Sequence, residues 1–224
     1  PKGYENIKGI YSCGDYILND EGVKKTAKTK DGDFVLVPIC SQPLLIVERL
    51  RNIQDNCEKV VLAFCVGNSW ETVQVEREVI ASNTKIIRLA NFSIDVTSET
   101  AKDIVKYLQC LMQKNINLIK VSHTVNRLGW QNGEFVPYSD KVKCDSISEF
   151  LGIYRAIESK GNYELWIKHC LKLRENIYLR LTMAASFAAP LIEIIGGLPF
   201  IVHLWGGTGA GKTVALNVAA SVWG

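Results

Sequence analysis

Short apolar runs separated by turn residues fill the first third of the chain. Several runs alternate apolar with polar positions, and turn tripeptides such as Cys13-Gly14-Asp15 and Gly67-Asn68-Ser69 lie between them. Alternation bounded by turn residues is typical of strands, so this part of the chain predicts an antiparallel meander. The predicted strands are residues 7–12, 16–18, 33–39, 44–50, 59–66 and 70–75.

A helix and a hairpin are predicted in the middle of the chain. Residues 97–115 carry apolar positions on one helical face, and Thr97 or Ser98 can cap the first turn. A short strand is expected at residues 118–121. In the following segment, LGWQNGEFVP, the pair Asn132-Gly133 stands between two short apolar arms, which is the strongest short-range signal for a hairpin.

The spacing of apolar residues becomes that of a helix from about residue 162. Asn162 is expected to cap a helix over residues 163–173, and Asn176 a second helix that ends at Gly196 and Gly197. Residues 181–202 carry only one charge, that of Glu193, over a length that can cross a bilayer. Because Pro190, Gly196, Gly197 and Pro199 interrupt this span, we expect a buried core helix and a buried strand, and no membrane.

A phosphate-binding signature closes the sequence, in the segment FIVHLWGGTGAGKTVALNVAASVWG. Residues 200–205 predict a strand and residues 214–222 a helix, and between them the chain fits G-x-x-x-x-G-K-[ST] without a mismatch. Strand, glycine loop and helix are the context that this motif requires. The matching residues are Gly206, Gly207, Thr208, Gly209, Ala210, Gly211, Lys212 and Thr213.

Each residue type in the motif has a physical role in binding ATP and Mg²⁺. Glycines let successive backbone N–H groups turn toward a phosphate, and the helix N-terminus adds partial positive charge. Lys212 is expected to reach the β- and γ-phosphates, and the Thr213 hydroxyl to coordinate Mg²⁺. The catalytic residues cannot be named from the sequence.

Composition changes this picture little. The 224 residues allow one large or two small domains, and the net charge of +3 neither demands nor excludes nucleic acid. The seven cysteines are odd in number and widely spaced, without a C-x-x-C pair, which predicts reduced thiols in a cytoplasmic protein rather than a disulfide or zinc framework. The polar first residues do not resemble a secretory signal.

A basic loop between two predicted strands, at residues 24–30, is a candidate DNA contact. Its lysines could bind a phosphate backbone, and the nearby Tyr11 and Tyr16 could stack on bases. The alternative is a solvated hairpin tip. Trp130 is expected to pack its own hairpin rather than to stack on a base. The basic residues are Lys24, Lys25, Lys28 and Lys30.

The change from strand-like to helical spacing of apolar residues predicts two domains, with a boundary between residues 141 and 160. Residues 1–145 are expected to form an α+β accessory domain, antiparallel and β-rich with one or two helices. Residues 146–224 are expected to hold a helical lead-in followed by the first strand, P-loop and helix of an α/β P-loop NTPase domain.

The hairpin and the P-loop together resemble one family, the domain of unknown function 927 of phages and plasmids, often described as helicase-like. The resemblance rests on Gly129, Trp130, Phe135 and Val136 in the hairpin and on the P-loop with residues 219–224 after it. It implies an AAA+-like ATPase of a mobile genetic element that assembles as a ring and moves along DNA during replication of the element.

This chain departs from such a motor because few residues follow Thr213. A motor needs an acidic pair on a neighbouring strand, and usually an arginine from a neighbouring subunit. The sequence therefore predicts an amino-terminal fragment, inactive alone, of an ATP-dependent DNA helicase or translocase. Two alternatives stay open: another P-loop enzyme such as a small-substrate kinase, and a nucleic-acid-binding or interaction module without catalysis of its own.

Overall fold

A computed structural model describes residues 12–67, 69–145 and 157–223 of the chain. Contacts divide the chain into two compact units, residues 1–124 and 125–224. Both units mix helices with strands, and the sheets are mainly antiparallel, which confirms the α+β class predicted for the first part of the chain.

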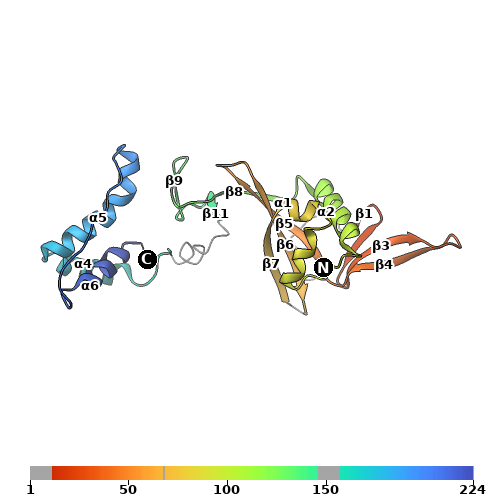
Figure 1. Ribbon diagram of the computed structural model, residues 1–224, viewed down its shortest axis with the longest axis horizontal. Helices are drawn as coiled ribbons and strands as arrows, with labels where there is room; N and C mark the ends of the chain where they lie inside the picture. Colours follow the sequence, from red (N-terminus) through yellow and green to blue (C-terminus); the bar gives the residue numbers. More distant parts are fainter. Residues whose placement is uncertain (1–11, 68, 146–156, 224) are drawn as a thin grey trace. The chain divides into compact units, whose positions relative to one another are not determined.

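The first sheet of unit 1 has the strand order β1-β2-β3-β4, with every neighbouring pair antiparallel. Figure 1 shows β3 and β4 extending as a two-stranded ribbon. Most of the basic loop predicted around residues 24–30 is in fact part of strand β3. The strands are β1 (Ser12–Cys13), β2 (Tyr16–Asn19), β3 (Gly22–Lys28) and β4 (Phe34–Cys40). The strand predicted at residues 7–12 lies mostly outside the described residues.

The second sheet of unit 1 has the order β8-β5-β6-β7. Strands β5, β6 and β7 form the predicted meander, whereas β8 pairs parallel with β5, with Glu48 opposite Lys120. A parallel neighbour requires a long crossover, and this one contains a short helix, a 3₁₀ helix and a long helix. The strands are β5 (Leu44–Asn52), β6 (Glu58–Val66), β7 (Ser69–Glu76) and β8 (Lys120–Val125).

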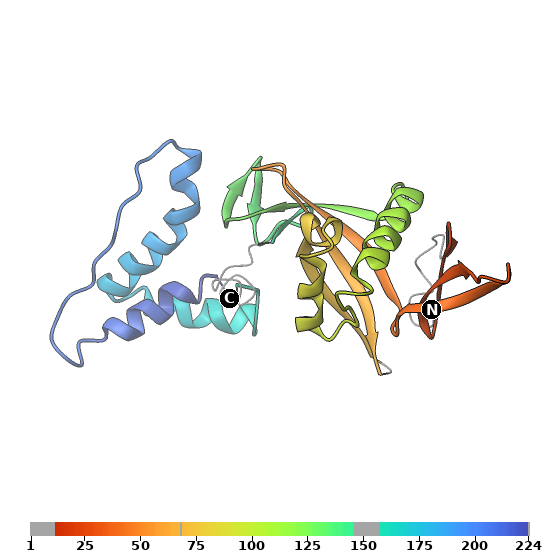
Figure 2. The same cartoon turned by 45° about the vertical axis from the view of Figure 1, so that its right-hand side comes forward.

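The crossover packs on the second sheet and forms the main core (Figure 2). Its elements are α1 (Arg77–Ala81), η1 (Ile86–Phe92) and α2 (Ala101–Asn115). The last confirms the predicted helix, but its N-cap is Thr100 rather than Thr97 or Ser98. Tyr107 of α2 is fully buried, and its hydroxyl donates to the Leu44 carbonyl at 2.7 Å. This buried hydrogen bond fixes the helix at the end of the sheet where β5 begins.

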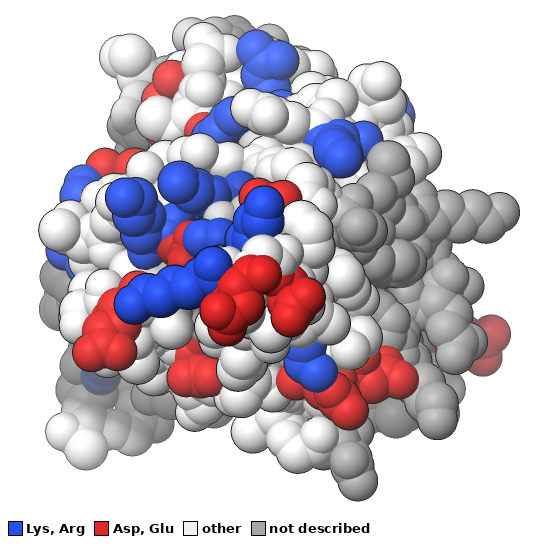
Figure 3. Space-filling model, turned by 90° about the vertical axis from the view of Figure 1, so that its right-hand side faces the viewer, with Lys and Arg blue, Asp and Glu red and all other residues white. Residues whose placement is uncertain are grey.

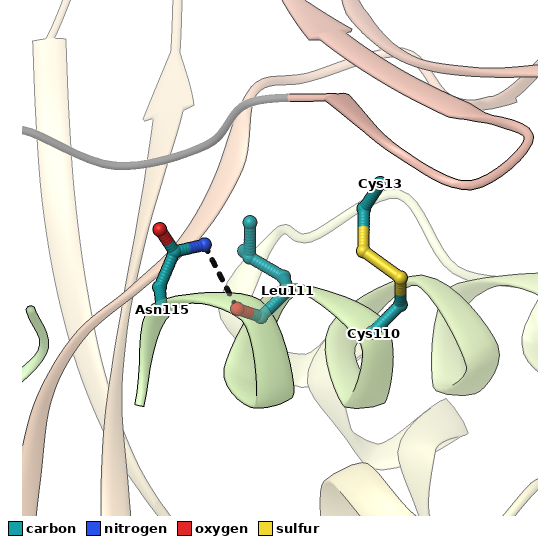
Figure 4. The surroundings of a disulfide bond; sticks show 4 residues. All are labelled: Cys13, Cys110, Leu111 and Asn115. Carbon is teal, nitrogen blue, oxygen red and sulfur yellow. Dashed lines mark hydrogen bonds between the residues drawn. A yellow bond between two sulfur atoms is a disulfide. The ribbon is translucent and has the colours of Figure 1, made fainter. Parts of the chain in front are cut away.

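A disulfide joins Cys13 of β1 to Cys110 of α2, across 97 positions of sequence (Figure 4). The prediction of seven reduced thiols is therefore wrong for these two cysteines. Spacing in the sequence could not indicate the pair, because only the packing of α2 beside β1 brings the two sulfur atoms together. The free cysteines of the described residues are Cys40, Cys57, Cys65, Cys144 and Cys170.

Unit 2 begins with the predicted hairpin, β9 (Gly129–Gln131) and β10 (Glu134–Val136). Asn132 and Gly133 form its turn, with φ of 49° and 84°. Positive φ at both central residues is what a tight hairpin turn needs, and Asn-Gly provides it at low cost. The short strand β11 (Val142–Cys144) follows.

Three helices complete unit 2: α4 (Tyr163–Leu173), α5 (Ile177–Ile194) and α6 (Lys212–Ala220). The predicted caps of the first two are confirmed. The Asn162 side chain accepts a hydrogen bond from the backbone N–H of Leu165, and that of Asn176 accepts from Tyr178 and Leu179. Side-chain caps of this kind satisfy N–H groups that have no partner inside the helix.

The bounds of α5 are as predicted, but its predicted burial is wrong. Only Thr182 and Met183 of this helix are buried. Its length and composition meet those of a membrane span, and 11% of it is buried. Glu193 is exposed, as expected for a surface charge. One such helix is weak evidence for a membrane, and the helix also lines the pocket described below.

Residues 200–205, predicted as a strand, form no backbone hydrogen-bond ladder with any described strand. Their side chains nevertheless alternate as they would in a strand. Phe200, Val202 and Leu204 face α5 and α6 across a cavity of ≈ 250 Å³, whereas Ile201 is 94% exposed. A strand needs a partner backbone to satisfy its N–H and C=O groups, and the described residues provide none here.

The two compact units meet between Thr124 and Val125. The hairpin and β11, which were assigned to residues 1–145, belong to the unit that starts at Val125. The reason lies in contacts far apart in sequence: Trp130 of the hairpin donates its indole N–H to the Pro190 carbonyl of α5 at 2.6 Å. That the chain has two separately folding domains, with a boundary between residues 141 and 160, stays a prediction.

Candidate nucleotide-binding site

The glycine loop at residues 206–213 leads directly into α6. Gly206, Gly209 and Gly211 all have positive φ, at 153°, 82° and 81°. Gly211 forms the N-cap of α6 in the left-handed conformation, so the helix begins at Lys212 without a side-chain cap. Because the loop offers no side chain to the first N–H groups of α6, these donors and the partial positive charge remain available to an anion.

Lys212 folds back over the loop. Its ammonium donates to the carbonyl oxygens of Gly206 and Gly207, both at 2.7 Å. These contacts hold the positive charge against the first two residues of the loop. A phosphate that entered here would meet this ammonium at the same place as the helix N-terminus.

Helix α6 packs against α5 and α4 on the side away from the loop. Cys170, Met183 and Val218 form a small apolar cluster between the three helices. The Ser186 hydroxyl donates to the Ala219 carbonyl at 2.7 Å, and the Trp166 indole donates to the Ser221 hydroxyl at 3.0 Å. These contacts fix the helix that carries Lys212 and Thr213.

The hairpin also packs against the end of this helix. Phe135 stacks on Trp223 with ring centroids 5.9 Å apart, and the Tyr138 hydroxyl donates to the Trp223 carbonyl. Trp130 packs against Phe135 at 5.1 Å, as predicted for a structural tryptophan. The two sequence motifs that suggested a family are therefore in contact within unit 2.

A pocket of ≈ 610 Å³ opens beside the loop. Three segments form its wall: the start of α5, the extended residues before the loop, and the loop with the start of α6. Sequence reasoning found only the last of these, because the approach of α5 depends on tertiary packing and leaves no local signal. The lining residues are Asn176, Tyr178, Leu179, Thr182, His203, Leu204, Trp205, Ala210, Gly211, Lys212, Val214 and Ala215.

Comparison with known proteins places this chain in a family. Residues 16–224 match the family model described as Domain of unknown function (DUF927). The chain belongs to this family. The match confirms the resemblance predicted from the hairpin and the P-loop, and it extends over both units.

One solved structure similar to this DUF927 chain is described as "SCCmec type IV Cch - active helicase". The two have a TM-score of 0.61 and 16% sequence identity over 96% of this chain, so they share a fold. The likeness covers 42% of that protein, so this chain spans less than half of its length. A comparison with curated proteins found no match.

The glycine-loop motif of this DUF927 chain offers Mg²⁺ one candidate ligand, the Thr213 hydroxyl, which is exposed at the second position of α6. None of the residues that line the pocket is acidic. Among the described residues, no group of three His, Cys, Asp or Glu side chains has the spacing of a metal site. The described lining of the pocket therefore has no carboxylate that could position an attacking water.

The basic segment forms part of the ribbon rather than a loop. Lys24, Lys25 and Lys28 lie on β3, and only Lys30 lies in the turn before β4. Figure 3 shows Lys and Arg side chains gathered at this end of unit 1 with Asp and Glu beside them. The neighbouring carboxylates reduce the positive potential that the sequence suggested.

Two of these lysines already have partners. The ammonium of Lys24 contacts Glu21, and that of Lys25 lies 2.7 Å from Asp103. Tyr16 cannot stack on a base because its ring is buried and its hydroxyl donates to Asp103. Burial, helped by the charge of Asp103, raises the pKa of Tyr16 to about 12. Tyr11 lies outside the described residues.

Proposed function

We propose that this chain supplies the phosphate-binding half of the nucleotide site of an ATP-dependent DNA helicase or translocase of a mobile genetic element. The observation that carries the proposal is the position of Lys212, at the start of α6 and folded over carbonyls of a glycine loop. In this function, residues 206–213 hold the phosphates of ATP and Thr213 holds Mg²⁺.

The likeness to an active helicase supports the choice of motor over kinase. A small-substrate kinase would also need a carboxylate as its base, so the described lining of the pocket, which has none, does not by itself separate it from a motor. In the same proposal, the complete protein assembles as a ring and acts in the cytoplasm. ATP hydrolysis that responds to DNA, without phosphorylation of small acceptors, separates the motor from the kinase.

Residues 1–224 are expected to bind Mg·ATP and to hydrolyse it at no more than background rate. The physical reason is the absence of acidic side chains from the described lining of the pocket, since Lys212 and Thr213 alone do not orient a water. Phosphate release from purified protein measures this. Turnover that disappears in Lys212→Ala would show that a complete catalytic site is already present.

DNA contact through the ribbon is expected to depend on Lys28 and Lys30, which are exposed and have no ion pair within the described parts of the chain. Each phosphate contact contributes about 0.9 to the slope of log affinity against log salt on duplex DNA. Replacing both lysines with alanine should therefore reduce the slope by about 1.8 for unrelated sequences alike, as measured by fluorescence anisotropy.

The matched control for this experiment is the pair Lys24→Ala and Lys25→Ala. These ammonium groups are held by Glu21 and Asp103, so their loss should leave the salt slope nearly unchanged. Equal slopes for wild type and the Lys28/Lys30 variant would assign the ribbon to a solvated surface. DNA contacts would then have to be sought elsewhere on the protein.

A further inference from the structure

We propose that the pocket beside the glycine loop binds the nucleoside of the nucleotide, with Tyr178 and Trp205 packing against the base. This inference rests on the proposed function, because it starts from phosphates held by residues 206–213. Ala210, Gly211 and Lys212 line the same pocket as Tyr178 and Trp205, so a ligand can reach both places at once.

The size and the lining of the pocket suit a nucleoside. Its volume of ≈ 610 Å³ lies within the range of small-molecule sites, about 300–1,000 Å³. Tyr178 is 76% exposed and Trp205 is 87% exposed, although both are large aromatic side chains at the rim of a cavity. A flat base that stacks on such rings removes apolar surface from water on both partners.

Two polar groups on the α5 side of the pocket, the Asn176 side-chain oxygen and the Thr182 hydroxyl, are already engaged by the helix. The Asn176 side-chain oxygen accepts from the N–H groups of Tyr178 and Leu179, and the Thr182 hydroxyl donates to the Tyr178 carbonyl at 2.8 Å. This wall therefore offers the ring of Tyr178 rather than a set of hydrogen-bonding groups. The ring, and not its hydroxyl, should carry the affinity.

Tyr178→Ala is the direct test, with two ligands that share phosphates and differ in the base. Calorimetry on residues 1–224 should show Mg·ATP binding about tenfold weaker in this variant, the usual effect of losing one aromatic stacking partner. Binding of Mg·tripolyphosphate should be unchanged. Tyr178→Phe should bind both ligands as wild type does, and Trp205→Ala should repeat the selective loss of ATP affinity.

Phe187→Ala provides the matched control, because this aromatic residue lies on the same helix, is 49% exposed and lines neither pocket. It should leave both affinities unchanged. Unchanged ATP affinity in Tyr178→Ala, or equal losses for ATP and tripolyphosphate, would overturn the nucleoside assignment. A wild-type protein that bound neither ligand would instead refute the proposed phosphate site itself.

Discussion

Replacing Lys212 with alanine is expected to weaken the binding of Mg·ATP by residues 1–224 about a hundredfold or more. The ammonium lies over the carbonyls of Gly206 and Gly207, at the N-terminus of α6, where the phosphates would enter. Removing one member of a desolvated charge pair costs about 2–5 kcal/mol, and each 1.4 kcal/mol is about tenfold in affinity.

Isothermal titration calorimetry measures this effect, and thermal unfolding of the same samples checks that the variant folds. Lys168→Ala is the matched control, because this lysine is exposed on α4 and lies outside the pocket. The control should bind as wild type does. A Lys212→Ala protein with wild-type affinity would show that the loop does not hold the phosphates.

Local side-chain chemistry made much of this fold predictable. Asn162 and Asn176 cap their helices through their own side chains, and Asn132-Gly133 turns the hairpin with positive φ. Each of these features depends on residues only a few positions apart, so the sequence contains the whole cause. The glycine-loop motif could be identified in the sequence for the same reason, since its residues are contiguous.

The parts that were missed depend on distant contacts. Strand β3 was assigned to a loop because its central residues are lysines and a threonine, and a ribbon beyond the core needs no buried apolar face. The parallel pairing of β8 with β5 joins residues about seventy positions apart in sequence, such as Glu48 and Lys120. Local periodicity contains no information on such pairings.

The candidate site shows the same limit. Tyr178 and Thr182 belong to a helix more than twenty positions before the loop, and nothing in its apolar pattern indicates that it lines a pocket. The apolar pattern of α5 also predicted burial, yet most of the helix is exposed. Hydrophobicity indicates that a surface will be covered, but it does not indicate by which element.

Loss of the disulfide between Cys13 and Cys110 is expected to lower the stability of unit 1 by about 3 kcal/mol and its melting temperature by about 10 °C. The bond closes a loop across 97 positions, so it restricts the unfolded chain strongly. Differential scanning calorimetry should show the shift both after reduction and in the double variant Cys13→Ala/Cys110→Ala.

Cys57→Ala is the control, because Cys57 is an exposed free thiol and its removal should leave the transition in place. Alkylation of the denatured, unreduced protein tests the bond itself, and five of the seven cysteines should react. If all seven reacted, Cys13 and Cys110 would be reduced neighbours, and the sequence-based expectation of free thiols would be restored. Because β1 and α2 would then be joined only by packing, the melting temperature of the double variant should equal that of wild type apart from the effect of losing the buried Cys13 and half-buried Cys110 side chains.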